Sequence, residues 1–568
     1  MSSEANYWER FQEQRIRRRI FLRSAGVTAV GGAAVALVGC GGGDSSSSGT
    51  QAPSTAKSGA TTAASATTAT RAKPAGNANV SVATLQEQST SPFFQTGGLS
   101  TPIFLHAFEG FYRIGADGRP APALATAFEQ ADAQTITFKL RQGAKFWDGS
   151  PVTADDIKWS FDAYTSQNPP AAPSVVLKKA VDSVTAPDPA TIVVKFTRPI
   201  PFQMEELGVT GVPRGWPVAS RAYYEKVGAD TFKQTPMCTG PYQVTKNSVG
   251  QFVELQANEN YYDPARIPHV KTIRLNIVPE QQTRLAQIKT GEADVIEGIV
   301  GPAADSLKNE SSVKIVKTAN TALLTVRFFD LWDANTNSVQ KDPRFREALN
   351  IAVNQDQVAK SLLKMGNPSP GVLIFPNSSG FDAGTLKPRA QDVARAKSLI
   401  SQAGATGSNF TLGAYTSSSY PLIPEIMQAY SGFWKEIGVN TKIETKESGT
   451  YFTEFQAKTP RGLGPISFPN FSSGALLLVG YYKTGAAYST TDYIPDLQDV
   501  ITKLSAEFDP NKQNELVKQG LKIVYDGFYM IPSPFVDSLW ATGSKIKGWD
   551  RIAGVPYVNG LETLTLSS

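Results

Sequence analysis

The sequence predicts an α/β protein that is divided into at least two lobes. Its 568 residues are too many to pack around one hydrophobic core. A hydrophobic content of 41% and a charged content of 18% are ordinary for a globular protein. Residues 135–161 predict a strand, a turn and a helix in that order, and residues 283–296 predict a helix followed by a strand.

The first of these two segments carries the clearest local signals. Apolar and polar residues alternate over residues 135–140, which predicts a strand with one buried face. Asp, Gly, Ser and Pro at residues 148–151 are typical of a turn. Thr153, with Asp156 three residues later, is a capping box, and apolar residues then recur at helical spacing. We therefore expect an amphipathic helix that begins next to Thr153.

The second segment combines a helix, a stop signal and a strand. Leu285 and Ile288 face inward on the predicted helix, and Gly291 is placed to end it as a C-cap. Two other places also have strand patterns, a first strand at residues 80–83 and a pair of short strands within residues 181–196.

The beginning of the chain has the composition of an export leader rather than of a domain. A basic segment at residues 17–23 precedes an uncharged run at residues 24–43, and Leu-Val-Gly-Cys ends the apolar part at Cys40. The alternative is an uncleaved transmembrane helix, because the run is about long enough to span a bilayer. Its many glycines make it a poor permanent span, so we expect a signal peptide over residues 1–40.

Two short motifs refine this expectation. Arg18 and Arg19, followed by Phe-Leu-Arg, resemble the twin-arginine export signal. Leu-Val-Gly-Cys resembles the lipobox of bacterial lipoproteins, which implies that Cys40 is acylated and becomes the first residue of the mature chain. Residues 41–76 are mostly Gly, Ser, Thr, Ala and Pro, and such a tract cannot bury enough apolar area to fold. They predict a disordered tether, or alternatively a glycosylated or wall-spanning stalk.

Charge and residue counts exclude several classes of function. The formal net charge is only +5, and the leader, with six arginines and three glutamates, supplies part of it. No concentrated basic face remains for nucleic acid, so we expect no nucleic-acid partner. Two cysteines and two histidines cannot assemble a cysteine–histidine zinc site or a cysteine-ligated iron–sulfur cluster, and we expect neither a metal nor a cofactor.

The segment at residues 135–161 closely resembles the signature of solute-binding protein family 5 of ABC importers, which includes receptors for peptides, nickel and oligosaccharides. Further blocks that resemble this family lie at residues 106–125, 236–242, 283–296, 342–352 and 392–404. The resemblance implies a two-lobed, periplasmic-binding-protein-like α/β fold of type II, in the large peptide-binding class, with the ligand in a cleft between the lobes.

The same resemblance implies how the chain divides. Lobe I is expected to comprise residues 77–325 and, after the chain returns, residues 532–568, whereas residues 326–531 form lobe II. The two crossings between the lobes are expected near residues 325–329 and 532–535.

Peptide-binding relatives carry Trp-x-x-Asp in the second lobe, and the aspartate holds the α-ammonium of the peptide. The corresponding residues here are 467–470, which end in Asn470. A neutral amide cannot neutralise a buried ammonium, and an unpaired buried cation costs several kcal/mol. The sequence therefore argues against a ligand that is an ordinary peptide with a free amino group. A shifted alignment register would instead bring Asp492 or Glu454 into this place.

Other candidate ligand contacts are glutamine, glutamate and aromatic side chains, each with a packing or solvated-loop role as the alternative. They are Gln86, Glu87, Trp216, Trp332, Tyr481, Tyr482 and Trp540.

The resemblance implies a lipid-anchored receptor outside the cytoplasmic membrane that captures a peptide, an oligosaccharide or another small solute. It would deliver this solute to a membrane permease driven by separate ATPase subunits. The chain has no Gly-x-x-x-x-Gly-Lys-Ser/Thr loop for nucleotide hydrolysis. An exported enzyme is the main rival from another class, but haem-attachment, nucleophile-elbow and dinucleotide motifs are missing. The third hypothesis is a ligand sensor for a signalling receptor.

Overall fold

The structure is a computed structural model, and it describes residues 73–83, 89–94, 101–166, 172–202, 216–333, 335–417, 420–486 and 488–567. The predicted leader, with Arg18, Arg19 and Cys40, lies outside the described residues, and so do Gln86 and Glu87. The first strand begins at Ala75, inside the stretch that the sequence assigns to the tether.

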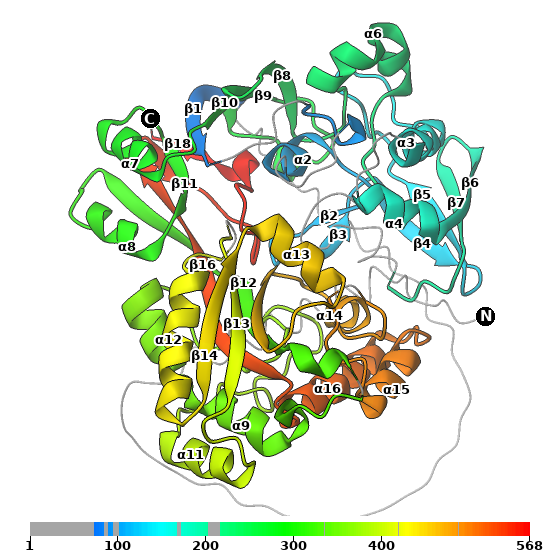
Figure 1. The fold of residues 1–568 in the computed structure, drawn as a ribbon. Helices are drawn as coiled ribbons and strands as arrows, with labels where there is room; N and C mark the ends of the chain where they lie inside the picture. Colours follow the sequence, from blue (N-terminus) through cyan, green and yellow to red (C-terminus); the bar gives the residue numbers. More distant parts are fainter. Residues whose placement is uncertain are drawn as a thin grey trace, which may run out of the picture. The chain divides into compact units, whose positions relative to one another are not determined.

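A ten-stranded mixed sheet organises the described chain (Figure 1). Its spatial order is β14 (Asn440–Lys446), β13 (Asn409–Tyr415), β15 (Leu463–Pro469), β12 (Val313–Phe328), β16 (Met530–Gly543), β11 (Val295–Ile299), β1 (Ala75–Val82), β10 (Val270–Ile277), β9 (Phe252–Ala257) and β8 (Tyr242–Ser248). Parallel pairs join β1 to β10 and β11, and β13 to β14 and β15, while β12 and β16 are antiparallel to their neighbours.

Three smaller sheets are also present in the described residues. The largest has the order β4 (Ala125–Gln130), β5 (Thr135–Leu140), β7 (Thr191–Phe196) and β6 (Val181–Asp188). The other two are antiparallel two-stranded sheets, β2 (Tyr112–Ile114) with β3 (Pro120–Pro122), and β17 (Ile546–Gly548) with β18 (Thr565–Leu566).

Helices lie between these strands along the chain. The α-helices are α2 (Thr101–Ala107), α3 (Ala154–Ser166), α4 (Ala172–Ala180), α6 (Arg221–Gln234), α7 (Gln281–Thr290), α8 (Gly301–Ala304), α9 (Pro343–Ala352), α10 (Gln355–Gln357), α11 (Val393–Gln402), α12 (Ile423–Glu436), α13 (Ser448–Gln456), α14 (Gly474–Tyr481), α15 (Pro495–Leu504) and α16 (Pro510–Asp526). Short 3₁₀ turns occur at Pro92–Phe94, Pro264–Arg266, Asp305–Leu307, Phe329–Trp332, Val339–Lys341 and Leu561–Thr563, and a π-helix at Val358–Leu363.

The local signals in the sequence are confirmed at the atomic level. The backbone N–H and the hydroxyl of Thr153 donate to Asp156, and the Asp156 N–H donates back to the Thr153 hydroxyl, so the capping box starts α3 as predicted. Gly291 ends α7 with a φ of 77°, a left-handed conformation that favours glycine. Leu285 and Ile288 are buried, also as predicted.

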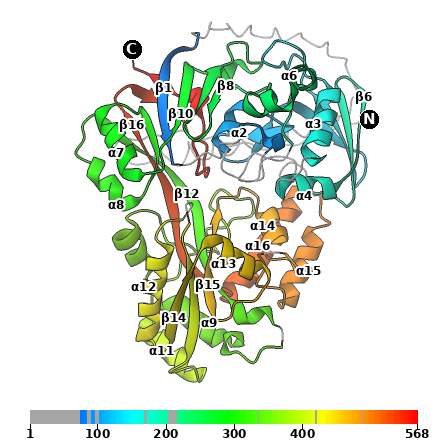
Figure 2. The ribbon, with the colours of Figure 1, turned by 45° about the horizontal axis from the view of Figure 1, so that its top comes forward.

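Strands β12 and β16 run side by side through both parts of the sheet (Figure 2). The first part of β12 pairs with β16 alone, whereas its second part, from Ala322 onward, also pairs with β15. A bulge separates the two parts, and Asn320 within it has a φ of 54°. The buried carboxylate of Asp537 accepts the N–H groups of Asn320 at 3.0 Å and Gly366 at 3.3 Å, which holds the bulge in place.

The bulge provides a natural division of the molecule. We call the described residues up to 321, together with residues 537–567, lobe I, and residues 322–536 lobe II. The crossings expected near residues 325–329 and 532–535 lie further along the same two strands, where β12 already pairs with β15. The domain limits drawn from the sequence stay predictions, and the strand pairing favours a crossing at the bulge.

Lobe II contains a buried cation that has no compensating anion among the described residues. The side chain of Arg327 on β12 is fully buried, and its Nε donates to the Thr325 hydroxyl at 2.9 Å. Both Nη atoms lack a hydrogen-bond partner among the described residues, and the guanidinium lies 5.5 Å from the ring centroid of Phe468. Burial lowers the pKa of Arg327 to about 10.

Replacing Arg327 by methionine should raise the free energy of unfolding, on the order of 1–4 kcal/mol, because it removes a buried charge whose hydration is not replaced. Chemical denaturation of the two proteins would measure the change. The matched control is Arg346→Met, since the buried Arg346 donates to the carbonyls of Gly527, Gln340 and Lys341 and its loss should destabilise the fold. If Arg327→Met is instead less stable than the wild type, interactions of the Arg327 guanidinium must compensate the cost of burying its charge.

Candidate functional site

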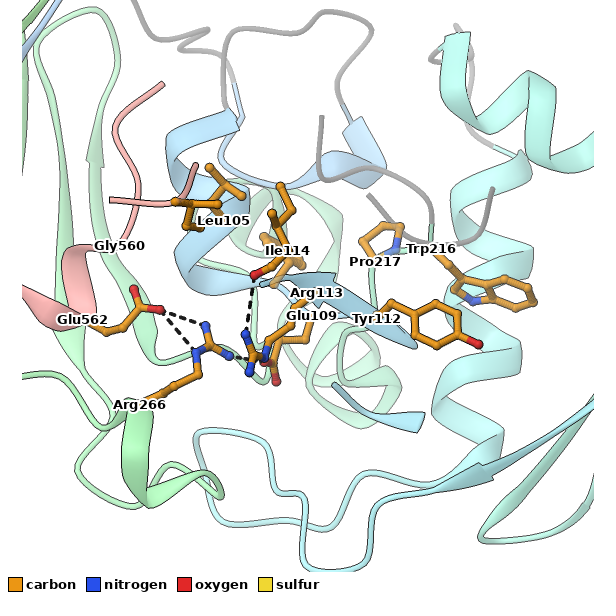
Figure 3. Close-up of a pocket in the computed structure, with 13 residues that line it drawn as sticks. Leu105, Glu109, Tyr112, Arg113, Ile114, Trp216, Pro217, Arg266, Gly560 and Glu562 are labelled. Carbon is orange, nitrogen blue, oxygen red and sulfur yellow. Dashed lines mark hydrogen bonds and ion pairs between the residues drawn. The ribbon is translucent and has the colours of Figure 1, made fainter. Parts of the chain in front are cut away.

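A small cavity lies in lobe I between α2, β2 and the segment that follows β16. Its volume is about 50 Å³. Figure 3 shows its lining side chains, which come from residues 105–114, 216–217, Arg266 and the C-terminal segment. Close packing at Gly240 brings α2 to this place, because a Cβ there would lie 2.4 Å from the His106 carbonyl oxygen. The neighbouring Cys238 is buried, and burial raises the pKa of its thiol, as expected for a small apolar packing residue.

A buried network of charges forms one wall of the cavity. Arg266 donates from Nη1 to Glu109 at 3.1 Å and from Nη2 to Glu562 at 3.0 Å. The hydroxyls of Tyr261 and Tyr262 also donate to Glu109, the latter at 2.6 Å. Burial by itself lowers the pKa of Arg266, but Tyr261 and the two carboxylates raise it well above its usual range. The network therefore keeps Arg266 charged inside the protein.

His106 is a neutral part of the same network. Its Nε2 accepts the N–H of Leu561 at 3.1 Å, so the proton is on Nδ1, which donates to the Pro102 carbonyl at 2.5 Å. Burial lowers the pKa of His106, although Glu562, 3.9 Å away, opposes this effect. The imidazole thus connects α2 to the C-terminal segment without adding charge.

The free energy of unfolding should fall as the pH is lowered from about 7 to about 5, because His106 stays neutral in the folded state. An unfolded histidine has a pKa of roughly 6.5, so below this pH the unfolded state binds more protons than the folded state. The groups that face His106 are Glu562, Arg266 and Arg551. Urea titrations at several pH values should show a weaker pH dependence in His106→Gln. An unchanged dependence would contradict the assignment of this titration to His106.

Asn470 lies where the two lobes meet. It directly follows β15, and its Nδ2 donates to the Asn320 carbonyl at 2.8 Å and to Asn377 Oδ1 at 2.9 Å. Gly554, in the segment after β16, is packed against it, since a Cβ at 554 would lie 2.6 Å from Asn470 Cγ. Both amide hydrogens of Asn470 are therefore used by the protein itself.

A second contact joins the lobes beside Asn470. In the turn between β2 and β3, Arg119 donates from Nη2 to the Asn377 carbonyl at 3.2 Å, and the Ala116 carbonyl accepts the N–H of Ala553 at 3.0 Å. The turn and the C-terminal segment thus meet lobe II as one surface.

Two of the predicted tryptophans lie in lobe I. Trp216 is buried, donates from Nε1 to the Ile157 carbonyl at 3.1 Å, and lines the cavity. Trp540 is also buried, and the Arg551 guanidinium covers its ring at 3.1 Å from the centroid and lies 4.4 Å from that of Trp549. The cation–π contact with Arg551 thus occupies one face of the Trp540 ring. A direct contact of Trp540 with a ligand stays a prediction.

The other three predicted aromatic residues pack inside lobe II. Trp332 stacks on Phe329 at 4.7 Å between ring centroids, and Tyr481 meets Phe468 edge to face at 5.0 Å. Tyr482 is fully buried, and its hydroxyl accepts the N–H of Leu373 at 2.7 Å. None of the three lines the cavity in lobe I. Their roles as ligand contacts stay predictions, and the position of Tyr482 favours core packing.

The two acidic residues that a shifted register would offer are paired within the protein. Asp492 accepts from Lys458 at 2.6 Å, and Glu454 accepts from Lys446 at 2.5 Å. Each carboxylate already has a lysine partner, and which of the three residues occupies this place stays a prediction.

The sequence interpretation missed the charged residues of the cavity. Glu109 and Arg113 lie in a mostly aromatic and apolar run, His-Ala-Phe-Glu-Gly-Phe-Tyr-Arg-Ile, within the family-like block at residues 106–125. Charged residues within such an apolar run are expected to be buried and paired with residues of opposite charge. Their partners, Arg266 and Glu562, are far away in the sequence and could not be assigned without coordinates.

No described helix has the length and hydrophobicity of a membrane span. No group of three or more His, Cys, Asp or Glu side chains within the described ranges is arranged to hold a metal ion.

Comparisons with known proteins address the family. The sequence model of bacterial extracellular solute-binding proteins, family 5, matches residues 119–476. The glutathione-binding protein GsiB of Pectobacterium atrosepticum is 26% identical over 400 residues, which cover 69% of this chain and 74% of that protein. The family consists of solute-binding proteins rather than enzymes.

Solved structures share the fold. NikA from Brucella suis in complex with Fe(III)-EDTA aligns with a TM-score of 0.74 and 19% identity, over 86% of this chain and 100% of that one. DppA from Helicobacter pylori in complex with the peptide STSA aligns with a TM-score of 0.68 and 20% identity, over 87% and 99%. The predicted two-lobed fold of the type II periplasmic binding proteins is thereby confirmed. The chain belongs to family 5 of the bacterial extracellular solute-binding proteins of ABC transporters.

Proposed function

We propose that this chain is a lipid-anchored receptor that captures a peptide-like or other small solute outside the cytoplasmic membrane and presents it to an ABC permease. The family match supports the solute-receptor role. The named ligands of the similar proteins are glutathione, the peptide STSA and Fe(III)-EDTA. Hinge closure between the lobes would convert binding energy into the shape that the permease recognises.

The observation that narrows the solute is the environment of Asn470. Its amide is neutral, and both of its hydrogens are bonded to Asn320 and Asn377. A free α-ammonium beside Asn470 would face a neutral amide, whereas the carboxylates of Asp492 and Glu454 are each paired with a lysine. We therefore propose a solute whose amino group is blocked, absent or bound elsewhere in the cleft.

Calorimetric titration tests this proposal with matched solutes. The probes are glutathione, Ser-Thr-Ser-Ala with a free amino terminus, its N-acetyl form, and an oligosaccharide such as maltotriose. We expect the acetylated peptide to bind at least as well as the free one, or the sugar to bind in place of both. If the free peptide binds about tenfold more tightly than the acetylated form, the proposal that the solute has no free amino group beside Asn470 is contradicted. The absence of binding to every solute class would contradict the receptor role.

Lipid anchoring through Cys40 is a separate part of the proposal. Cells fed with labelled palmitate should incorporate label into the wild-type protein and into Cys238→Ser, since Cys238 is buried. Cys40→Ser should lose the label and be released from membranes, because Cys40 is the acylated residue of the predicted lipobox. Replacing Arg18 and Arg19 by lysine should leave the chain unexported if the leader uses the twin-arginine route. A labelled Cys40→Ser protein would disprove the anchor.

A further inference from the structure

One aromatic side chain of lobe I is part of the hydrophobic core of lobe II. Phe202 follows the end of β7 and is only 4% exposed. The buried residues that pack with it in one hydrophobic cluster all lie within residues 322–536. A second contact lies beside it, because Gln513 on α16 donates from Nε2 to the Pro201 carbonyl at 3.2 Å. Pro201 and Phe202 therefore join the two lobes at a place outside β12 and β16.

The segment that carries Phe202 is fixed to lobe I at its base. Ile200 is buried, and its N–H donates to the Ala133 carbonyl at 3.1 Å. Pro199 and Pro201 fix two φ angles and keep the residues before them extended. The segment is therefore short and stiff, and it loses little conformational entropy when its end enters lobe II.

The hydrogen-bond donor on lobe II is also held in position. Gln513 lies in the first turn of α16, whose N-cap is Asp509. Its Nε2 donates to the Glu507 carbonyl at 2.7 Å as well as to the Pro201 carbonyl. Both amide hydrogens of Gln513 are thus bonded within the protein while the two lobes are in contact here.

The contact at Phe202 lies apart from the crossing strands. In Figures 1 and 2, α15 and α16 lie on the side of lobe II below α4 of lobe I, whereas β12 and β16 pass between the lobes toward the opposite side. The bonds of Asn470 with Asn320 and its contact with Gly554 lie beside the bulge of that crossing. A hinge motion at the bulge would therefore separate Phe202 from lobe II when the lobes open.

We propose that Pro201 and Phe202 form a latch that holds the lobes closed, and that Phe202 and Gln513 set the affinity for the solute without contacting it. The inference rests on the proposed function, since it concerns closure around a transported solute. Opening would expose the Phe202 ring and would separate the Pro201 carbonyl from Gln513. Burial of a phenylalanine side chain changes an equilibrium constant by about tenfold or more. The latch therefore keeps a closed form populated before the solute binds, and it slows the release of the solute.

The distance between the lobes tests the latch directly, with no solute present. Spin labels on Lys179→Cys of α4 and Gln519→Cys of α16, both at exposed positions, would report this distance in the whole chain by pulsed electron paramagnetic resonance. Cys40→Ser is the background, and the remaining Cys238 is buried. We expect a closed population at short distance with wild-type Phe202, and a ratio of closed to open form about tenfold lower or more in Phe202→Ala.

Two further variants keep the test interpretable. Phe508→Ala is the matched control, since Phe508 lies just before α16 but is 37% exposed, and it should leave the ratio unchanged. Gln513→Ala removes the hydrogen bond to Pro201 without altering the hydrophobic core, and it should lower the ratio a few-fold. This variant decides the matter if Phe202→Ala does not fold. A wild type that is wholly open without solute, or a wild-type ratio in both Phe202→Ala and Gln513→Ala, would overturn the inference.

The solute panel separates this inference from the proposed function. Phe202→Ala should raise the Kd of every solute that binds by the same factor, several-fold or more, mainly through faster dissociation. A factor that differs between solutes would make Phe202 a solute contact and overturn the latch. Equal solute affinity of wild type and Phe202→Ala would also overturn the latch while supporting the receptor role. A lobe distance that depends on Phe202, with no binding of any panel solute, would support the latch and overturn the receptor role.

Discussion

Replacing Arg266 by methionine should lower the free energy of unfolding by about 3–5 kcal/mol, since it leaves two buried carboxylates without their cation. Glu109 and Glu562 both lie in the interior of lobe I, with side chains only 3% and 10% exposed. Methionine fills a similar volume, so the loss reports mainly the uncompensated charge. Urea denaturation followed by circular dichroism would measure it.

The consequences of this change extend beyond stability. Arg266 connects the segment after β9 to Glu109, next to α2, and to Glu562 near the C-terminus, so its removal should also loosen the wall of the cavity.

The exposed pair of Arg221 and Glu225 supplies the control. Arg221→Met removes a comparable guanidinium from an ion pair whose members are 55% and 57% exposed. Solvent screens such a pair, and the substitution should leave stability nearly unchanged. Equal stability of wild type and Arg266→Met would show that the two carboxylates become protonated at little cost, and the network would then not hold the lobe together.

Local structure followed from the sequence where the determining residues are close together in the chain. The capping box of Thr153 and Asp156 and the left-handed Gly291 each depend on contacts within a few residues, and both are confirmed. The predicted first strand at residues 80–83 was too short, because β1 begins at Ala75, where its parallel pairing with β10 starts. That pairing depends on residues nearly two hundred positions away, which no local pattern contains.

The site could be predicted only in part, for the same physical reason. Asn470 was identified through its correspondence to the Trp-x-x-Asp motif of peptide-binding relatives, but its partners Asn320 and Asn377 come from other segments. The stacking of Arg551 on Trp540 joins a loop to a strand, and no spacing in the sequence indicates it.

Asn470→Asp should lower the free energy of unfolding by about 2–5 kcal/mol. The wild-type amide donates to two oxygens, Asn320 O and Asn377 Oδ1, whereas a carboxylate would place a negative charge against both. Each buried polar group left without a partner costs about 1–3 kcal/mol, and the charge adds to this. Denaturant titration at neutral pH would measure the loss, and Asn409→Asp, at an exposed asparagine, should cause almost none.

The pH dependence of Asn470→Asp gives a sharper test than stability at one pH. Burial and the two facing oxygens would raise the pKa of the new carboxyl above its unfolded value of roughly 3.9. The folded state then holds its proton longer, so the destabilisation should be small near pH 4 and should grow as the pH rises. The affinity for free-amine peptides should not increase, because Gly554 and Asn377 already occupy the surroundings of this side chain. A variant of wild-type stability that gains free-amine peptide binding would instead place residue 470 in contact with the solute.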